Sequence, residues 1–177
     1  GMQSDNDVYM WGRGEQGQLA TSTRMSNSEP THPDFFVGKD IAQVALGKDY
    51  GAAVTRETGE LFTWGNGQNG KLGHGDLETR ALPKAVGVRF FQNKKIIYVA
   101  TGDFHTLAIT EDGCVFSWGM GFYGQLGHGD QLDIGTPKLV EALRNETIVL
   151  CEATSTCSIG LTKEGTIYVW GLLDSYQ

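Results

Sequence analysis

Short runs of alternating hydrophobic and polar residues follow one another along the chain, and glycine-containing turns separate them. Ile96–Thr101 and His105–Thr110 are short runs rich in β-branched residues, which is typical of strands. Asp112-Gly113 is the clearest turn between such runs, because glycine readily adopts the positive φ that a tight hairpin requires. Only Lys138–Asn145 has a helix-like pattern, and it is too short to change the class. The pattern therefore predicts a chain of antiparallel strands.

One combination of a strand and a glycine-rich turn returns along the chain. "VYMWGRGEQGQLA" starts at Val8, "LFTWGNGQNGKLG" at Leu61, "VFSWGMGFYGQLG" at Val115 and the shorter "IYVWG" at Ile167. After each of the first three tryptophans, glycine stands at positions +1, +3 and +6, leucine at +8 and proline at +19. The Trp-Gly pairs that mark the four units are Trp11-Gly12, Trp64-Gly65, Trp118-Gly119 and Trp170-Gly171. Agreement at this many positions in three copies predicts a repeat architecture.

Each unit also has a second half. Return strands that end at Thr55, Thr110 and Thr162 lead through a short charged turn into the next Trp-Gly strand. A unit is therefore a hairpin, a glycine-rich crossing, a proline-containing outer stretch and a return strand. Units of about 50 residues with four short strands are typical of β-propeller blades. We predict an all-β fold of β-propeller blades, each of four antiparallel strands, with about three blades plus a partial fourth repeat.

The repeats define a single predicted domain over residues 7–177. The predicted repeats span about 7–60, 61–114, 115–166 and, in part, 167–177. Gly1-Met2 is interpreted as a cloning remnant, and residues 1–6 are predicted to be disordered. A propeller is stable because closure of the ring removes open sheet edges. Two hypotheses follow: the chain is a fragment of a longer protein, or it self-associates so that two chains complete a ring.

Composition narrows the function classes. Glycine accounts for 25 of 177 residues and hydrophobic residues for 40%, which favours a packed core with many tight turns. The formal net charge of −7 argues against direct nucleic-acid binding, which depends on lysine and arginine. The sequence contains no apolar stretch of about 18 residues, so no membrane span is expected. Three cysteines without CxxC spacing favour a reducing compartment, and we expect a cytoplasmic or nuclear protein.

The recurring glycines and histidines resemble two kinds of chemical site. Each glycine-rich turn formally matches GxGxxG, but the dense glycines that follow cannot form the helix that a dinucleotide site needs. His74-Gly75-Asp76 and His128-Gly129-Asp130 belong to different units, whereas a zinc site needs three or four converging ligands. We expect these residues to fix turns through bonds to the backbone. No cofactor, metal or hydrolytic or redox site is predicted, so we do not expect an enzyme.

The repeat resembles a known family. "WGxGxxGQLGHGD", followed at a distance by "VATGDFHTLAITEDGCVFSWG", is similar to the regulator-of-chromosome-condensation repeat over about residues 7–171. The family forms seven-bladed propellers, and these repeats fill less than half of one. The first repeat lacks the "GHGD" segment, and Tyr50 and Cys157 replace the return-strand histidine that is present as His105. His105 is expected to satisfy buried backbone groups at the end of its strand.

The resemblance implies two competing functions. Members of the family occur in ubiquitin ligases, kinases and ciliary proteins, where the propeller recruits partners, so the leading hypothesis is a protein–protein interaction scaffold that binds its partner through blade-end loops. The founding member is instead a guanine-nucleotide exchange factor for a Ran-like small GTPase. Its functional aspartate lies just before the return-strand histidine position, which Asp49 occupies in this chain. Exchange on a small GTPase is therefore the alternative hypothesis.

The less regular segments are the predicted partner-binding surfaces. Ala20–Phe36 has lost the repeat pattern, and Val86–Lys95 combines phenylalanines with basic residues, a mixture that protein interfaces favour. The candidates are Asp49, Phe35, Phe36, Arg89, Phe90, Phe91, Lys94 and Lys95. Packing between blades is the alternative role for the phenylalanines. Packing is also the expected role of the tryptophans, because the Gly-Trp-Arg-His-Thr motif through which a plant photoreceptor of the family absorbs ultraviolet light is absent.

Overall fold

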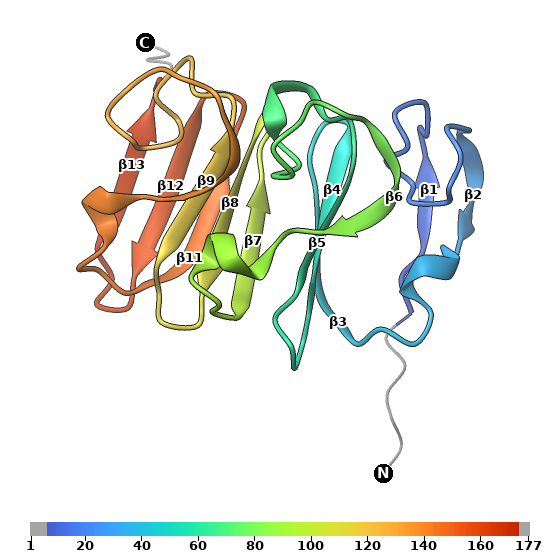
Figure 1. The fold of residues 1–177 in the computed structure, drawn as a ribbon, viewed down its shortest axis with the longest axis horizontal. Helices are drawn as coiled ribbons and strands as arrows, with labels where there is room; N and C mark the ends of the chain where they lie inside the picture. Colours follow the sequence, from blue (N-terminus) through green and yellow to red (C-terminus); the bar gives the residue numbers. More distant parts are fainter. Residues whose placement is uncertain (1–6, 174–177) are drawn as a thin grey trace.

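The computed structural model describes residues 7–173 and shows a nearly all-β chain (Figure 1). The strands are β1 (Met10–Gly12), β2 (Asn27–Thr31), β3 (Ile41–Leu46), β4 (Tyr50–Thr55), β5 (Leu61–Gly65), β6 (Arg80–Ala85), β7 (Ile96–Thr101), β8 (His105–Thr110), β9 (Val115–Gly119), β10 (Ile134–Leu139), β11 (Ile148–Ala153), β12 (Cys157–Thr162) and β13 (Ile167–Gly171). Four 3-10 turns connect them: η1 (Asp34–Phe36), η2 (Gln68–Gly70), η3 (Val88–Phe91) and η4 (Glu141–Leu143). Residues 1–6, for which the sequence predicts disorder, lie outside the described part of the chain.

The strands form successive antiparallel sheets. Two sheets have four strands, in the orders β3-β4-β5-β6 and β7-β8-β9-β10, and they are flanked by β1-β2 and by β11-β12-β13. The sheets follow one another side by side in the order of the chain, as Figure 1 shows from blue to red. This arrangement confirms the predicted fold class of propeller blades, with part of a further repeat. Within residues 7–173, no helix has the length and apolarity of a membrane span.

Sheets and sequence repeats are out of step with each other. The sheet β3–β6 takes β3 and β4 from the end of the first repeat and β5 and β6 from the start of the second. The sheet β7–β10 joins the second and third repeats in the same way. Each repeat therefore supplies two strands to each of two neighbouring blades. The charged hairpin turn between two sequence repeats joins two strands of the same sheet.

The hydrophobic core lies between consecutive sheets. Trp64 and Trp118 are 0% exposed and belong to two successive clusters. The Trp64 Nε1–H donates to the carbonyl oxygen of Gln18 at 2.8 Å, and the Trp118 Nε1–H donates to that of Lys71 at 2.9 Å. The indole thus fills the space between two blades and satisfies its polar atom on the neighbouring blade, as a buried tryptophan requires.

The outer tryptophans differ because of their neighbours. Trp11 is 59% exposed, although it stands at the same repeat position as Trp64. In the part of the chain that the structure describes, no sheet precedes β1, so nothing covers the Trp11 ring. Trp170 is half-buried against the cluster between the sheets of β7–β10 and β11–β13.

The glycines after each tryptophan allow two segments of backbone to pass close to each other. Gly65 has a φ of +99°, and a Cβ there would lie 2.6 Å from the carbonyl oxygen of Asp49. A Cβ at Gly67 would lie 2.0 Å from the carbonyl oxygen of Glu78. Only glycine allows the chain to pass this closely, so the GxG pattern is explained by the crossing of the outer loop over the strand ends.

Each blade has two distinct ends. At the Gly-loop end, the glycine-rich loops 66–79 and 120–133 lie beside the turns 47–49 and 102–104, because Tyr50 pairs with Gly65 and His105 with Gly119. At the hairpin end lie the β4–β5 and β8–β9 turns, together with η1 and η3. In Figure 1 the Gly-loop end of the sheet β3–β6 is up and its hairpin end is down.

Candidate functional site

Beside a departure at the end of the first repeat, the second repeat departs from the other two at two positions of the Gly-loop end. Seven residues after the tryptophan it has Lys71, where the first and third repeats have Gln18 and Gln125. Two residues after the tryptophan it has Asn66, in contrast to arginine and methionine. Asp49, at the end of the first repeat, precedes β4, which pairs with β5 of the second repeat. The later repeats have phenylalanine and threonine at the position of Asp49.

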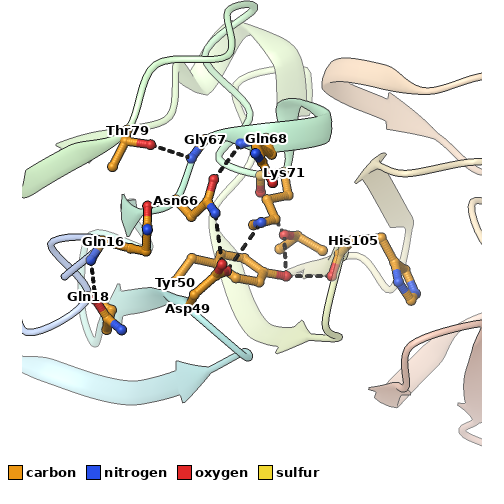
Figure 2. Close-up of polar contacts among 11 residues, drawn as sticks. Gln16, Gln18, Asp49, Tyr50, Asn66, Gly67, Gln68, Lys71, Thr79 and His105 are labelled. Carbon is orange, nitrogen blue, oxygen red and sulfur yellow. Dashed lines mark hydrogen bonds and ion pairs between the residues drawn. The ribbon is translucent and has the colours of Figure 1, made fainter. Parts of the chain in front are cut away.

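The three departures meet in space, as Figure 2 shows. The Nζ of Lys71 lies 3.2 Å from Oδ1 of Asp49. The Nδ2 of Asn66 donates to the other carboxylate oxygen of Asp49 at 2.7 Å, and the backbone N–H of Asn66 donates to the Asp49 carbonyl oxygen at 3.0 Å. Asp49 is therefore held by an ammonium and by an amide side chain, and we call Asp49, Asn66 and Lys71 the acid–lysine site.

The lysine of this site is almost completely buried. The Lys71 side chain is 1% exposed, and its Nζ lies 5.3 Å from the centre of the Tyr50 ring and 5.9 Å from that of Phe104. Burial lowers the pKa of the Lys71 ammonium below its ordinary value, and the Asp49 carboxylate opposes this shift. The aromatic faces add cation–π attraction for the charged form. The Asp49 side chain is 23% exposed, so the charge pair can be reached from solvent only through its acid.

Glutamine has a simple structural role at the equivalent positions. The Gln18 Oε1 accepts from the backbone N–H of Gln16 at 2.9 Å, and Gln125 accepts in the same way from Tyr123 at 2.8 Å. Lysine cannot accept a hydrogen bond. In the second repeat the Oδ1 of Asn66 instead accepts from the N–H of Gln68 at 2.9 Å, one residue before the position that the glutamines bind.

A second chain of contacts links the return strands of neighbouring blades. The Tyr50 hydroxyl donates to the carbonyl oxygen of His105 at 2.5 Å. His105 in turn contacts the Ser158 hydroxyl through Nε2 at 2.8 Å, and that hydroxyl donates to the carbonyl oxygen of Gln125 at 2.7 Å. Because the single hydroxyl hydrogen is already used, the His105 Nε2 must carry the proton and donate it. His105 therefore binds a hydroxyl rather than the backbone groups that the sequence led us to expect.

The tautomer of His105 makes the blade junction sensitive to acid. Its Nδ1 is buried and has no hydrogen-bond partner among the described residues, so a second proton would be unsatisfied. Burial lowers the pKa of His105 to about 4, whereas an unfolded histidine has a pKa of about 6.5. The unfolded chain therefore binds the proton more readily. The stabilisation is complete above about pH 6.5 and is lost as the pH falls toward 4.

We expect this single histidine to reduce the free energy of unfolding by about 3 kcal/mol between pH 6.5 and pH 4, at up to about 1.4 kcal/mol per pH unit. The change His105→Gln keeps an N–H donor for Ser158 but cannot titrate, so it should flatten the acid dependence. Urea unfolding at a series of pH values measures the slope. An unchanged slope in the glutamine variant would show that the acid sensitivity arises elsewhere.

The other histidines and the acidic turn residues have local roles. His74 and His128 contact the strand hydroxyls of Thr63 and Ser117 through Nε2 at 2.9 and 3.0 Å. Asp76 accepts from the backbone N–H of Glu78 at 3.1 Å, as expected for a turn. Across residues 7–173, no group of three or more His, Cys, Asp or Glu side chains is placed to hold a metal ion.

The remaining predicted binding residues lie at the hairpin end, away from Asp49. Phe36 is 2% exposed and packs edge-on against Trp64, although its sequence context suggests exposure, and Phe91 is buried against Phe116 and Trp118. Both phenylalanines end a 3-10 turn that folds back over the core, so they have the packing role that was kept as the alternative. Phe35 is half-buried.

The basic residues around η3 remain at the surface. Arg89 lies over the half-buried Phe90 ring at 5.1 Å, and Lys95 is exposed. Lys94 is half-buried and pairs with Asp112 of the neighbouring hairpin turn. The structure therefore does not combine the predicted candidates into one surface. Sequence reasoning named Asp49 but missed Lys71 and Asn66, although comparison of the repeats at +2 and +7 contains the signal.

The sequence pattern of the regulator of chromosome condensation (RCC1) repeat matches residues 5–54, 58–109 and 112–161, and a second pattern with the same description matches residues 96–125. The chain belongs to the RCC1 repeat family. Human E3 ubiquitin-protein ligase HERC2 is 42% identical over 177 residues, which cover 97% of this chain and 4% of HERC2. The Arabidopsis thaliana ultraviolet-B receptor UVR8 is 36% identical, with 94% of this chain and 37% of UVR8 covered.

Solved RCC1-repeat propellers have the same fold. The crystal structure of human WBSCR16 matches with a TM-score of 0.81 and 27% identity, over 93% of this chain and 42% of WBSCR16. The chain thus spans less than half the length of each of these relatives. Within the family's repeat, the glycines and tryptophans belong to the common framework, whereas the acid–lysine site combines Asp49 of the first repeat with Asn66 and Lys71 of the second.

Proposed function

We propose that this RCC1-repeat chain is a protein-interaction module whose Gly-loop end binds a protein partner, with the acid–lysine site at its centre. The observation that carries the proposal is the buried charge pair of Asp49 and Lys71. It stands where the other repeats use an uncharged glutamine. In many folds the loops at the ends of a rigid scaffold carry the function. The Gly-loop end is the end of the blades that contains the charged pair of Asp49 and Lys71.

The energetics support a role beyond the fold. Taking an ammonium out of water costs several kcal/mol, and a buried ion pair is often no more stabilising than neutral packing. Because Gln18 and Gln125 show that the fold accepts a neutral side chain at this position, stability alone does not explain Lys71. The lysine instead holds the carboxylate of Asp49 in one orientation while leaving it partly open to solvent. A fixed, reachable carboxylate is suited to an arginine, a lysine or a backbone N–H of a partner.

Exchange of guanine nucleotide on a Ran-like small GTPase is the second candidate function. Asp49 favours it, because this residue occupies the position of the functional aspartate in the family resemblance. The structure adds that Asp49 lies in a turn at a blade end, where a loop of another protein has access. In this mechanism the acid would bind the GTPase rather than perform covalent chemistry.

Asp49→Asn tests the proposal, because it removes the charge and keeps the shape. Asp40 is a matched control: it is also paired with a basic residue, Arg56, but lies at the hairpin end. We expect proteins captured from a cell lysate by the wild-type chain to be lost with Asp49→Asn and kept with Asp40→Asn. Equal loss or equal retention in the two variants would contradict a site at Asp49.

A nucleotide-release assay with purified Ran and related small GTPases separates the two functions. Acceleration of release by the wild-type chain, abolished in Asp49→Asn and kept in Asp40→Asn, would support the exchange factor. Binding without acceleration would support the interaction module. Thermal unfolding of each variant shows whether a loss of binding comes from a loss of folding.

A further inference from the structure

The glycine-rich loop of the third repeat carries an exposed aromatic pair. Phe122 is 62% exposed and Tyr123 is 37% exposed, and their rings lie 5.0 Å apart in an edge-on arrangement. At the same positions the first repeat has Glu15-Gln16 and the second has Gln68-Asn69. The loop conformation therefore tolerates polar side chains, and the aromatic rings are not required for its folding.

A leucine extends this apolar surface. Leu132 is exposed, and its carbonyl oxygen would lie only 1.9 Å from a Cβ at Gly121, so the two segments of the loop run in direct contact. The adjacent Asp133 accepts from the backbone N–H of Gly121 at 2.9 Å, which fixes this contact. We call Phe122, Tyr123 and Leu132 the third-loop patch.

The patch lies in acidic surroundings. Asp130 and Asp133 belong to the same loop and are exposed, and Asp103 precedes Phe104, whose carbonyl oxygen accepts from the N–H of Met120 at 2.9 Å. Residues 96–137 contain no lysine or arginine. Each of the loop acids uses an oxygen for a backbone N–H of its own turn, so these carboxylates are held in place at the rim of the patch.

A cation on an aromatic face already occurs at this end of the molecule. The Lys48 Nζ from the first repeat lies 5.7 Å from the centre of the Phe104 ring. Phe104 is connected to the third loop through Met120. The Phe122 and Tyr123 rings offer the same kind of contact, and residues 96–137 supply no lysine or arginine to make it.

We propose that the third-loop patch docks a segment of a protein partner that is rich in lysine or arginine. Guanidinium or ammonium groups would lie over the two rings, and their aliphatic stems would pack on Leu132. The acidic rim attracts such a segment and repels an acidic one. The proposal rests on the proposed function, because it assumes that the Gly-loop end binds protein. It adds the charge of the partner and a second point of contact beside the acid–lysine site.

Selection from a displayed library of random peptides of about 12 residues tests this without a known partner. The bait is the purified chain, and the selected peptides are titrated by fluorescence anisotropy. Phe122→Gln/Tyr123→Asn is the test variant, because it copies the loop of the second repeat. Val88→Gln, which changes an exposed apolar residue at the hairpin end, is the matched control.

We expect the selected peptides to carry net positive charge and to bind the test variant at least about tenfold more weakly, or about 1.4 kcal/mol, with no change for Val88→Gln. The charge-neutralising variant Asp103→Asn/Asp130→Asn should slow association, and added salt should weaken binding. Acidic or neutral peptides, or peptides that bind the test variant unchanged, would overturn the proposal. If those peptides lose binding with Asp49→Asn, the proposed function stands and only the role of the third-loop patch is overturned. If no peptide is selected, the proposed function and the role of the patch are both contradicted.

Discussion

Trp118→Ala is expected to lower the free energy of unfolding by about 4 kcal/mol, the usual range for a large core aromatic being about 3–5 kcal/mol. The Trp118 ring fills the space between two four-stranded sheets and is fully buried. Its removal leaves a cavity beside Phe91 and a lost donor for the Lys71 carbonyl oxygen. Urea unfolding followed by circular dichroism measures the loss.

Trp11→Ala is the matched control for this prediction. Trp11 occupies the same position of the repeat but is more than half exposed, so its loss should cost less than about 1 kcal/mol, as is usual at surface positions. A similar destabilisation by the two changes would mean that the indole acts within its own strand rather than between sheets. A difference of several kcal/mol would show that the tryptophan stabilises the fold through its contacts with the neighbouring blade.

Asp49→Thr is expected to destabilise the chain by about 3 kcal/mol, because loss of one partner of a buried ion pair leaves the other uncompensated. Lys71 is the fully buried partner, and the rings of Tyr50 and Phe104 cannot replace a carboxylate. Lys71→Gln should cost less, about 1 kcal/mol, because Asp49 can then be hydrated from its open side. Urea unfolding of both single variants measures these losses.

The double variant Asp49→Thr/Lys71→Gln completes a double-mutant cycle. It installs the residues of the third repeat, Thr156 and Gln125, at the matching positions. We expect its free energy of unfolding to lie about 1 kcal/mol below that of the wild type, which, against about 4 kcal/mol for the sum of the two single changes, gives a coupling energy of about 3 kcal/mol between the two positions. Additive losses would show that the two charges do not stabilise each other. A stable double variant is also the cleanest reagent for the binding experiments, because it removes the charges without an unpaired ion.

The period and composition of the sequence were sufficient to predict the blades. A tryptophan followed by glycines at fixed spacing predicts the end of a strand and a close crossing of the chain. Both features form within one repeat, so its own sequence is sufficient to predict them. The acid–lysine site is different, because it depends on pairing. Asp49 and Lys71 are far apart in the sequence and meet only because β4 pairs with β5 in the register that places Tyr50 opposite Gly65.

The aromatic candidates illustrate a second limit of sequence reasoning. Phe36 and Phe91 stand in irregular segments and next to another phenylalanine, which resembles an exposed anchor. In the structure, η1 and η3 turn one ring of each pair inward, and Leu143 of η4 has the same buried place in the third repeat. Counted from the tryptophan, Phe36 and Leu143 stand at +25 but Phe91 stands at +27, so an alignment on tryptophan hides the equivalence of the second repeat.

The offset between repeats and sheets governs how such a chain can be lengthened or divided. A duplicated repeat inserted at a hairpin turn would bring two strands that complete the preceding sheet and two that begin the next, so the ring gains a blade and no existing sheet loses its pairing. The repeating unit of the sequence is therefore not the set of strands that forms one sheet. For the same reason, a cut at residues 56–60 would divide the sheet β3–β6, whereas a cut at residues 86–95 falls between two whole sheets.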